Sequence, residues 1–145
     1  MRVELQEGYP DIAVTIKCPS AESEEVRRIE TLLRGFDQRL SGVKDGVTAL
    51  IDREDVLYFE SVDKRCYLYT ADAVYETALK LYELEERLGP AGFIRGAKSQ
   101  ILNIAKIASL CPDFGGRLEV RLENGENLIV SRQYARQLKE RLGLK

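Results

Sequence analysis

Apolar and polar residues alternate along most of the chain from Leu40 onwards, and a period of two is typical of half-buried β-strands. Polar and glycine-containing turns separate the alternating runs. Another alternating run, residues 11–17, predicts a strand near the N-terminus. The remaining pattern predicts strands over residues 47–51, 56–61, 66–70, 73–77, 107–110, 117–123 and 127–130.

The clearest local signal is a hairpin near the end of this series. Residues 117–123 alternate strictly, so their three large apolar side chains lie on one face. Asn124-Gly125 follows and favours a type I′ turn, which needs a positive φ at both central residues. The chain is then expected to return along residues 127–130.

Three segments have apolar residues at helical spacing instead. The first follows Ser20, the expected N-cap, and carries a stripe made of Val26, Ile29, Leu33 and Phe36. The second has Leu81, Leu84 and Leu88 and is ended by Gly89-Pro90. Ser131 is expected to cap the third. Many short strands in meandering order, with two or three short helices, predict a β-rich α+β fold.

Composition narrows the class of protein. The chain has 145 residues, of which 44% are hydrophobic and 32% charged, so it can bury a core and fits neither a disordered tail nor a membrane protein. Its apolar runs are far shorter than the roughly 20 residues that span a bilayer. Glu4 stands where a signal peptide would be apolar, and we therefore expect a cytoplasmic protein.

The chain has no histidine, which excludes Ser-His and Cys-His catalysis and His-based zinc sites. Its three cysteines, Cys18, Cys66 and Cys111, form no Cys-x-x-Cys pair. We therefore expect neither an enzyme nor a bound metal or cofactor. Cys66 follows Lys64 and Arg65, two cations that are expected to lower the pKa of its thiol.

Charge is divided unevenly along the chain. Residues 1–90 carry 12 basic and 19 acidic side chains, a net −7, whereas residues 91–145 carry 10 basic and 5 acidic ones, a net +5. Such asymmetry indicates contact with nucleic acid or another anionic surface, although a solvated basic face that balances the acidic half has the same composition.

Arg132 stands in the expected first turn of the last helix, where a cation faces the positive end of the helix dipole. No acidic residue in that turn offsets it. Exposed amide groups beside an arginine suit a phosphate. The alternative is that Arg132 extends into water or pairs with a distant acid.

Three stretches resemble the characteristic segments of LytTR-type DNA-binding domains. Residues 55–61, DVLYFES, resemble the family's D-I-x-Y-F-E-S strand. Residues 93–103, FIRGAKSQILN, resemble its F-x-R-x-x-x-S-x-x-V-N segment, and residues 125–134, GENLIVSRQY, resemble its closing G-x-x-x-x-V-S-R-x-Y run. The stretches occur in the family's order, and the resemblance covers about residues 40–143.

The resemblance implies a compact stack of mostly antiparallel strands that reads duplex DNA with loops between strands. It implies a transcriptional regulator that acts as a dimer on paired half-sites. Three segments would supply the contacts: the turn after residue 61, the stretch around residue 95 and the start of the last helix. The implied DNA-binding residues are Lys64, Arg65, Cys66, Arg95, Lys98, Ser99, Arg132, Gln133 and Arg136.

Side-chain chemistry suggests a division of labour among these residues. Lys98 or Arg132 suits guanine O6 and N7, and Gln133 suits adenine. Arg95, Ser99 and Arg136 are better suited to contact phosphates and so to position the protein on the duplex. Relatives often have Asn or His near position 98 and His in the first loop, where this chain has Lys98 and Cys66. We therefore expect a different preferred base sequence, with Lys64 or Arg65 taking over the first groove contact.

Residues 1–38 lie outside the resemblance and are expected to form a strand–helix extension, a candidate dimerisation segment, before a DNA-binding domain at 39–145. They are too short for the receiver domain that many family members carry. The resemblance therefore implies a receiver-less regulator whose input signal could come from a protein partner. The alternative function is a protein-interaction module that docks a regulatory partner through the acidic N-terminal half.

Overall fold

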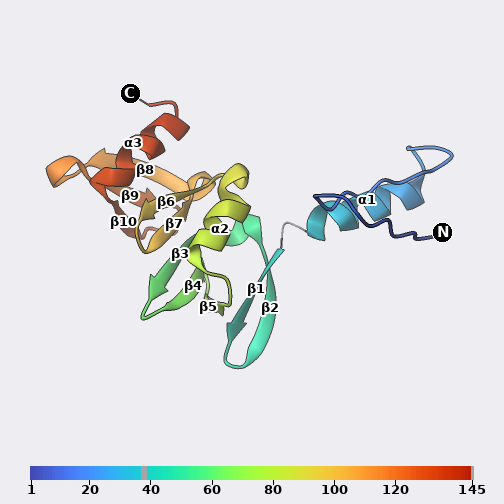
Figure 1. Cartoon of the computed structure of the whole chain (residues 1–145). Coiled ribbons are helices and arrows are strands. Elements are labelled where there is room, and N and C mark those ends of the chain that lie inside the picture. Colours follow the sequence, from blue (N-terminus) through green and yellow to red (C-terminus); the bar gives the residue numbers. More distant parts are fainter. Residues whose placement is uncertain (37–38, 145) are drawn as a thin grey trace. The chain divides into compact units, whose positions relative to one another are not determined.

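The structure, a computed structural model, describes residues 1–36 and 39–144. The chain divides into two units, Met1–Asp37 and Gln38–Lys145 (Figure 1). The predicted domain boundary at residue 38 falls outside the described residues.

The first unit contains one helix, α1 (Glu24–Phe36), and its described residues form no strand. The strand expected over residues 11–17 is therefore wrong. Alternation alone does not make a strand, because an extended segment needs a neighbour for its ladder hydrogen bonds, and none of the described strands pairs with these residues. Ile12 and Val14 are accordingly 99% and 64% exposed.

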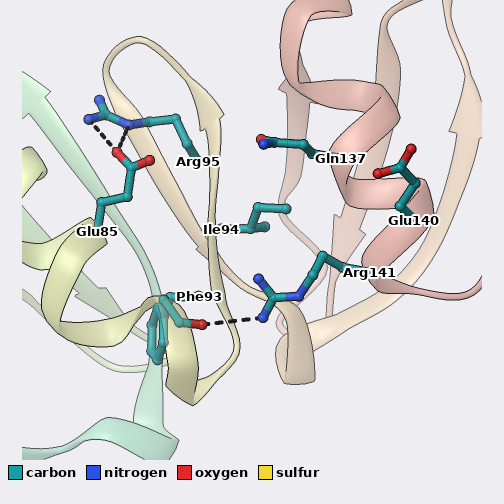
Figure 2. A pocket seen from close by; sticks show the side chains of 8 residues that line it. Glu85, Phe93, Ile94, Arg95, Gln137, Glu140 and Arg141 are labelled. Atoms are coloured by element: carbon teal, nitrogen blue, oxygen red, sulfur yellow. Dashed lines mark hydrogen bonds and ion pairs between the residues drawn. The ribbon is translucent and has the colours of Figure 1, made fainter.

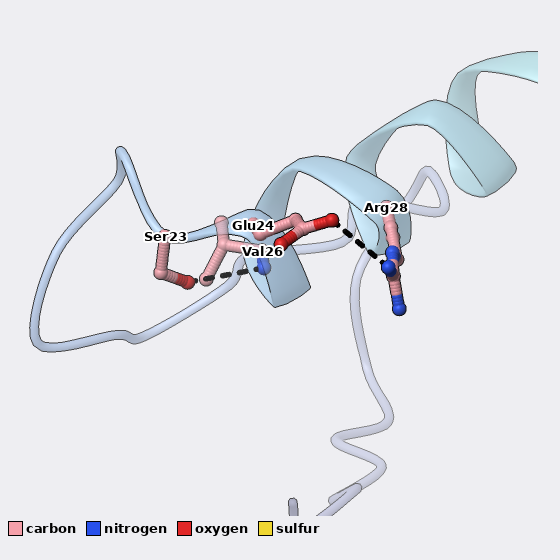
Figure 3. A network of polar contacts seen from close by, with 4 residues as sticks. All are labelled: Ser23, Glu24, Val26 and Arg28. Carbon is pink, nitrogen blue, oxygen red and sulfur yellow. Dashed lines mark hydrogen bonds and ion pairs between the residues drawn. The ribbon is translucent and has the colours of Figure 1, made fainter.

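The N-cap of α1 is Ser23 rather than Ser20. Ser23 Oγ accepts a hydrogen bond from the Val26 N–H at 3.2 Å, and Arg28 pairs with Glu24 at 2.9 Å one turn along the helix (Figure 3). Ser20 Oγ instead accepts from the Glu22 N–H in a local turn. Both serines satisfy the capping preference, and the backbone bond from Arg27 N–H to the Ser23 carbonyl decides between them.

The second unit has two antiparallel sheets, as the predicted β-rich α+β fold requires. The first sheet has the strand order β2-β1-β5-β4-β3-β7-β6, and the second has the order β10-β9-β8. The strands of the first sheet are β1 (Arg39–Lys44), β2 (Val47–Asp52), β3 (Val56–Val62), β4 (Arg65–Thr70), β5 (Val74–Thr77), β6 (Phe93–Ala97) and β7 (Gln100–Asn103). Those of the second are β8 (Ile107–Pro112), β9 (Leu118–Leu122) and β10 (Asn127–Val130).

Helices and short 3₁₀ turns complete this unit. Helix α2 (Leu81–Leu88) precedes β6, as predicted, and helix α3 (Arg132–Arg141) follows β10. The 3₁₀ turns are η1 (Arg53–Asp55), η2 (Gly89–Ala91), η3 (Ile104–Lys106) and η4 (Phe114–Gly116).

The β9–β10 hairpin forms, but its turn is not the predicted type I′. Gly125 has a φ of 90°, whereas Asn124 is not among the described residues with positive φ. The Gly125 N–H donates to the Leu122 carbonyl at 2.9 Å, and the Glu126 N–H donates to Asn124 Oδ1 at 3.1 Å. This is a longer loop with one left-handed glycine, which the Asn124 side chain stabilises through a local hydrogen bond.

Apolar residues on the two faces of the first sheet form two cores. On one face, Leu84 and Leu88 of α2 pack with Phe59, Leu68 and Ile101. On the other face, the second sheet and α3 cover a cluster that includes Tyr58, Leu102, Leu118, Val120, Val130 and Leu138. Successive strand residues point to opposite faces, so neighbours such as 101 and 102 contribute to different cores. The first sheet is therefore the middle layer of the unit (Figure 1).

Replacing Asn103 by leucine is expected to destabilise this unit by about 1–3 kcal/mol, because a buried carbonyl and a buried N–H would lose their partner. Asn103 is 4% exposed; its Nδ2 donates to the Val56 carbonyl at 2.8 Å, and its Oδ1 accepts from the Ala105 N–H at 3.1 Å. Urea unfolding followed by circular dichroism measures the loss. Asn127→Leu, at an exposed position on β10, is the control, and equal stability of the two variants would contradict the expectation.

Candidate nucleic-acid interface

Three segments that are distant in sequence meet at one edge of the second unit. They are the β3–β4 turn at Asp63-Lys64, the β6–β7 turn at Lys98-Ser99 and the N-terminus of α3. Near the end of β3, the Ser61 N–H donates to the Ser99 carbonyl at 2.8 Å. The Ser131 N–H donates to the Gly96 carbonyl at 2.9 Å. The β6–β7 hairpin therefore joins the other two segments, and we call this edge the loop edge.

Gly96 allows β6 to lie close to Leu102 of β7 and Val130 of β10, directly before α3 begins. It is buried, and a Cβ atom at this position would lie 3.0 Å from Leu102 Cδ1 and 3.5 Å from Val130 Cγ2. A side chain here would push β6 away from the second core and with it the hydrogen bond to Ser131. The glycine thus fixes the place where the last helix begins relative to the β6–β7 turn.

Three cations of the loop edge are exposed and lack an ion-pair partner among the described residues: Lys64, Lys98 and Arg132. Lys64 and Asp63 have φ values of 67° and 50°, so both central residues of the turn are left-handed, as a type I′ turn requires. This tight turn carries the Lys64 side chain beyond the ends of β3 and β4. One cation from each segment is therefore free to meet an anion.

The other exposed residues predicted from the sequence surround these cations. Arg65 pairs with Glu76 at 3.9 Å, and Arg136 pairs with Glu140 at 3.3 Å. Both pairs are solvent-exposed, and such pairs are worth little in water, so a phosphate can compete for either arginine. Ser99 and Gln133 are exposed at the β6–β7 turn and in the first turn of α3.

Arg95 does not point into solvent as a phosphate-binding residue would. Its side chain is 15% exposed, and its guanidinium lies 2.8 Å from Glu85 Oε2 of α2 (Figure 2). Its Nη1 also donates to the Lys98 carbonyl at 2.6 Å. Arg95 therefore joins α2 to the β6–β7 turn and positions Lys98. No sequence signal pairs it with Glu85, because the two lie on different elements that only the folded sheet brings together.

Replacing Glu85 by alanine is expected to weaken DNA binding about fivefold, because Arg95 would no longer hold the Lys98 turn in one place. Fluorescence anisotropy with a labelled duplex measures the change. Glu86→Ala removes the same charge from the exposed neighbouring position and is the control. If removal of negative charge were all that mattered, both variants would bind the polyanion more tightly than the wild type.

Cys66 lies in the core and not at the loop edge, which corrects its place among the expected DNA contacts. It is 5% exposed and packs in the core beneath α2. Burial raises the pKa of its thiol from 9.0 to about 11, although Lys80 nearby lowers it in part. The expectation of a lowered pKa is therefore wrong. Strand alternation is the physical reason: Arg65 points outward, so Cys66 must point inward.

This burial predicts that only two of the three thiols react quickly. Cys18 and Cys111 are exposed, and we expect a maleimide to label both at pH 8 while Cys66 is labelled only in urea. Mass spectrometry after timed quenching counts the labels. Three equal labelling rates would contradict the buried position.

The buried thiol also makes stability depend on pH. Because folding raises the pKa of Cys66, the stability that the neutral thiol contributes is present below pH 9 and is lost as the pH rises towards 11.

The N-terminus of α3 lacks a side-chain cap, so Ser131 does not cap the helix as expected. Ser131 occupies the N-cap position, yet its Oγ is buried and has no hydrogen-bond partner in the structure. The first turn contains no acidic residue. The first N–H groups of a helix have no intrahelical acceptor, so Arg132 stands beside uncapped amide groups. This end of α3 combines two features that favour an anion.

Gly116 lies against Arg132 and was not singled out from the sequence. A Cβ atom at Gly116 would lie 3.2 Å from Arg132 Cγ and 3.4 Å from its Cδ. Its φ of 82° also favours glycine. The aliphatic part of Arg132 therefore rests on bare backbone. The adjacent pair Gly115-Gly116 is the only signal in the sequence that marks this loop, and a pair of glycines does not reveal its neighbour.

Acidic side chains gather at the opposite end of the second unit. Asp52, Asp55, Asp72 and Glu123 line a hollow together with Lys106, which pairs with Glu123 at 3.7 Å. The Glu123 N–H also donates to the Lys106 carbonyl at 3.0 Å, so the β9–β10 turn belongs to this end. The described residues contain no acidic, cysteine or histidine group arranged to hold a metal ion. These carboxylates therefore lie at the end of the unit opposite the loop edge.

None of the helices described is long and apolar enough to cross a membrane. The helices α2 and α3 are instead amphipathic, with Leu84, Leu88, Ala135 and Leu138 buried against the sheets.

Comparison with known proteins identifies a matching family model and a solved structure with a similar fold. The family model of the LytTr DNA-binding domain matches residues 46–143. A LytTr DNA-binding domain from Bacillus cereus has a similar structure, with a TM-score of 0.70 and 26% sequence identity over 74% of this chain and 98% of that one. The predicted fold class and resemblance are thus confirmed.

Two curated proteins are similar over most of this chain. The sensory transduction protein LytT of Enterococcus faecalis is 34% identical over 66% of this chain, which spans 39% of that protein's length. A Staphylococcus aureus protein described as an uncharacterized HTH-type transcriptional regulator is 33% identical over 72% of this chain and 71% of its own length. The matched part in each case includes a substantial share of the second unit, because that unit makes up most of the chain.

Proposed function

Because this chain belongs to the family of LytTR DNA-binding domains, we propose that it is a transcriptional regulator that binds duplex DNA in a sequence-specific way through the loop edge. The observation that carries the proposal is the meeting of Lys64, Lys98 and Arg132, three cations without ion-pair partners among the described residues, on one edge. A DNA-binding domain is not an enzyme class. The alternative of a protein-docking module has no support in the relatives.

The proposed contacts divide into base reading and phosphate positioning. Lys98 and Arg132 lie at turn and helix ends, where their donors suit guanine O6 and N7, and Gln133 beside them suits adenine. Lys64, on the tight β3–β4 turn, takes the first groove contact that the sequence left open between it and Arg65. Phosphate positioning falls to Arg65, Ser99 and Arg136, which form the rim. Cys66 packs in the core and Arg95 positions the Lys98 turn, so neither is assigned a DNA contact.

A binding-site selection experiment tests the proposal. The full chain is mixed with a library of random duplexes, bound DNA is amplified, and the enriched duplex is then titrated at several salt concentrations. We expect one enriched sequence and a log–log salt slope between about −3 and −5, given about 0.9 per neutralised phosphate and the five exposed cations above. Failure to enrich any sequence, with equal weak binding to all duplexes, would overturn sequence-specific recognition.

We also propose that the chain acts as a homodimer, with a second copy covering α1. None of the described residues 1–33 is buried, and Leu32 is 75% exposed. A 13-residue helix is marginal in water by itself, so α1 needs an apolar surface against its stripe. The helix carries both acidic and basic residues, Glu24 and Glu25 before Arg27 and Arg28, and such a helix can meet its own copy with opposite charges facing.

Sedimentation of the full chain and of Ile29→Glu tests the homodimer. We expect the wild type to have twice the monomer mass at micromolar concentration and the variant to be monomeric, with both binding a single half-site equally. A monomeric wild type would refute the homodimer and would favour a separate protein partner that supplies the input signal. We also propose the cytoplasm as the compartment of the protein, as expected from the sequence, because a regulator that binds duplex DNA must have access to it.

A further inference from the structure

Phe114 is held in solvent by a well-braced loop between β8 and β9. Its side chain is 85% exposed, the highest value among the large hydrophobic residues described in the second unit. Leaving a phenylalanine in water forgoes about 1.5–3 kcal/mol of burial free energy, so a loop without another role would turn such a ring inward. The exposed ring therefore suits contact with another molecule.

The loop has little freedom to move the ring. The Asp113 N–H donates to the Arg117 carbonyl at 2.9 Å, which closes the loop across η4. The Arg117 side chain then braces it from within: Nε donates to the Phe114 carbonyl at 3.1 Å, and Nη2 lies 3.3 Å from Asp113 Oδ2. Gly115 and Gly116 follow, both left-handed, with φ values of 75° and 82°. The exposed ring is thus presented by a closed loop and does not belong to a loose end.

Strand register places this loop at the loop edge. Leu118, at the start of β9, pairs with Pro112 of β8 on one side and with Val130 of β10 on the other. The η4 loop therefore leaves the second sheet at the same end as Ser131 and α3 (Figure 1). Gly116 then contacts the Arg132 side chain, as described above. The acidic hollow lies at the other end of these strands, beside the β9–β10 turn.

We propose that Phe114 is a fourth DNA-contacting element, whose ring packs on the deoxyribose and base-edge surface of the duplex next to the site of Arg132. This inference rests on the proposed function and extends it to a residue outside the three expected segments. An aromatic ring among unpaired cations suits a polyanion that also has apolar sugar faces. A protein partner is less well matched, because the centres of protein interfaces are depleted of charged residues.

Alanine substitution in the full chain separates this contact from a charge contact. With the duplex enriched by selection, we expect Phe114→Ala to bind about tenfold more weakly with an unchanged salt slope, because no phosphate contact is lost. Arg132→Ala should bind more weakly and reduce the slope by about one. Leu50→Ala, an apolar residue that is 67% exposed at the acidic hollow, is the matched control and should bind like the wild type.

A fluorescence readout places the ring at the DNA directly. The chain contains no tryptophan, so Phe114→Trp carries a single indole. We expect its emission to shift and to be quenched as the enriched duplex is added, whereas Leu50→Trp should show no change. Because both positions are exposed, neither variant is expected to misfold.

Each other outcome has a distinct meaning. If the wild type binds the enriched duplex but Phe114→Ala binds equally well and the indole emission does not respond, the inference is wrong and the proposed function stands. If Phe114→Ala instead changes only the sedimenting mass, Phe114 contacts protein and the inference is likewise overturned. If the wild type enriches no duplex, the proposed function itself fails and the inference fails with it.

Discussion

Replacing Lys98 and Arg132 together by alanine should weaken binding to the enriched duplex at least about thirtyfold. Each good contact to a base edge contributes about 1–3 kcal/mol of discrimination, and every 1.4 kcal/mol is a factor of ten in affinity. Both side chains are exposed and free of ion pairs within the described chain, so neither substitution breaks an ion pair of the fold. The loss should therefore come from the interface alone. Anisotropy titrations at fixed salt measure it.

The experiment needs a control for the loss of two positive charges, which by itself weakens binding to DNA. Arg53→Ala with Lys106→Ala removes the same two charges at the acidic end of the unit, where Lys106 lines the hollow. This control should lose only a few-fold in affinity, through the long-range field. The enriched sequence should also change for the Lys98 and Arg132 double variant. Equal losses in the two double variants, with the same enriched sequence, would show that the loop edge does not read bases.

Replacing Phe59 by alanine should destabilise the second unit by about 3–5 kcal/mol, a large part of the 5–15 kcal/mol by which domains are usually stable. Phe59 is 0% exposed and lies on β3 beneath α2, with its ring centroid 5.9 Å from that of Phe93. The cavity would separate α2 from β6, and Glu85 and Arg95 depend on that contact. Partly unfolded protein should consequently appear at physiological temperature.

Urea unfolding followed by circular dichroism gives the size of this effect. Val47→Ala, on β2 and 65% exposed, is the control and should change the unfolding free energy by less than about 0.5 kcal/mol. A loss smaller than about 1 kcal/mol for Phe59→Ala would mean that the first core does not hold the middle sheet. Added DNA should stabilise the wild type but restore the variant only in part.

The strands could be found in the sequence wherever a local pattern had a partner close by in the chain. Residues 56–61 begin with a continuous apolar run and residues 66–70 alternate, with only a short turn between them, and the structure pairs them as β3 and β4. Residues 11–17 alternate equally well and form no strand, since the described chain offers them no neighbour. The turn at Asn124-Gly125 shows the same limit on a smaller scale, because Asn124 Oδ1 accepts a hydrogen bond from the Glu126 N–H and stabilises a turn of another type.

The residues of the loop edge were found through the three matched stretches, and burial then divided them. Alternation along β4 already implies that Arg65 and Cys66 face opposite ways, so the error at Cys66 was avoidable. The role of Arg95 could not be predicted, because its partner Glu85 is ten residues away on a helix. The contact of Gly116 with Arg132 could not be predicted either, because it joins the η4 loop to the start of α3, which only the second sheet brings together.

The sequence by itself determined the family, the β-rich α+β class, the positions of most strands and of α2, and a basic C-terminal third within an acidic chain. These properties follow from periodicity, turn residues and charge, which are local and additive. Only the tertiary structure decided which cations are free, which are bound to acids, and that Lys64, Lys98 and Arg132 share one edge. Those features depend on strand register and on two backbone hydrogen bonds between distant segments, Ser61 to Ser99 and Ser131 to Gly96, and no local pattern contains them.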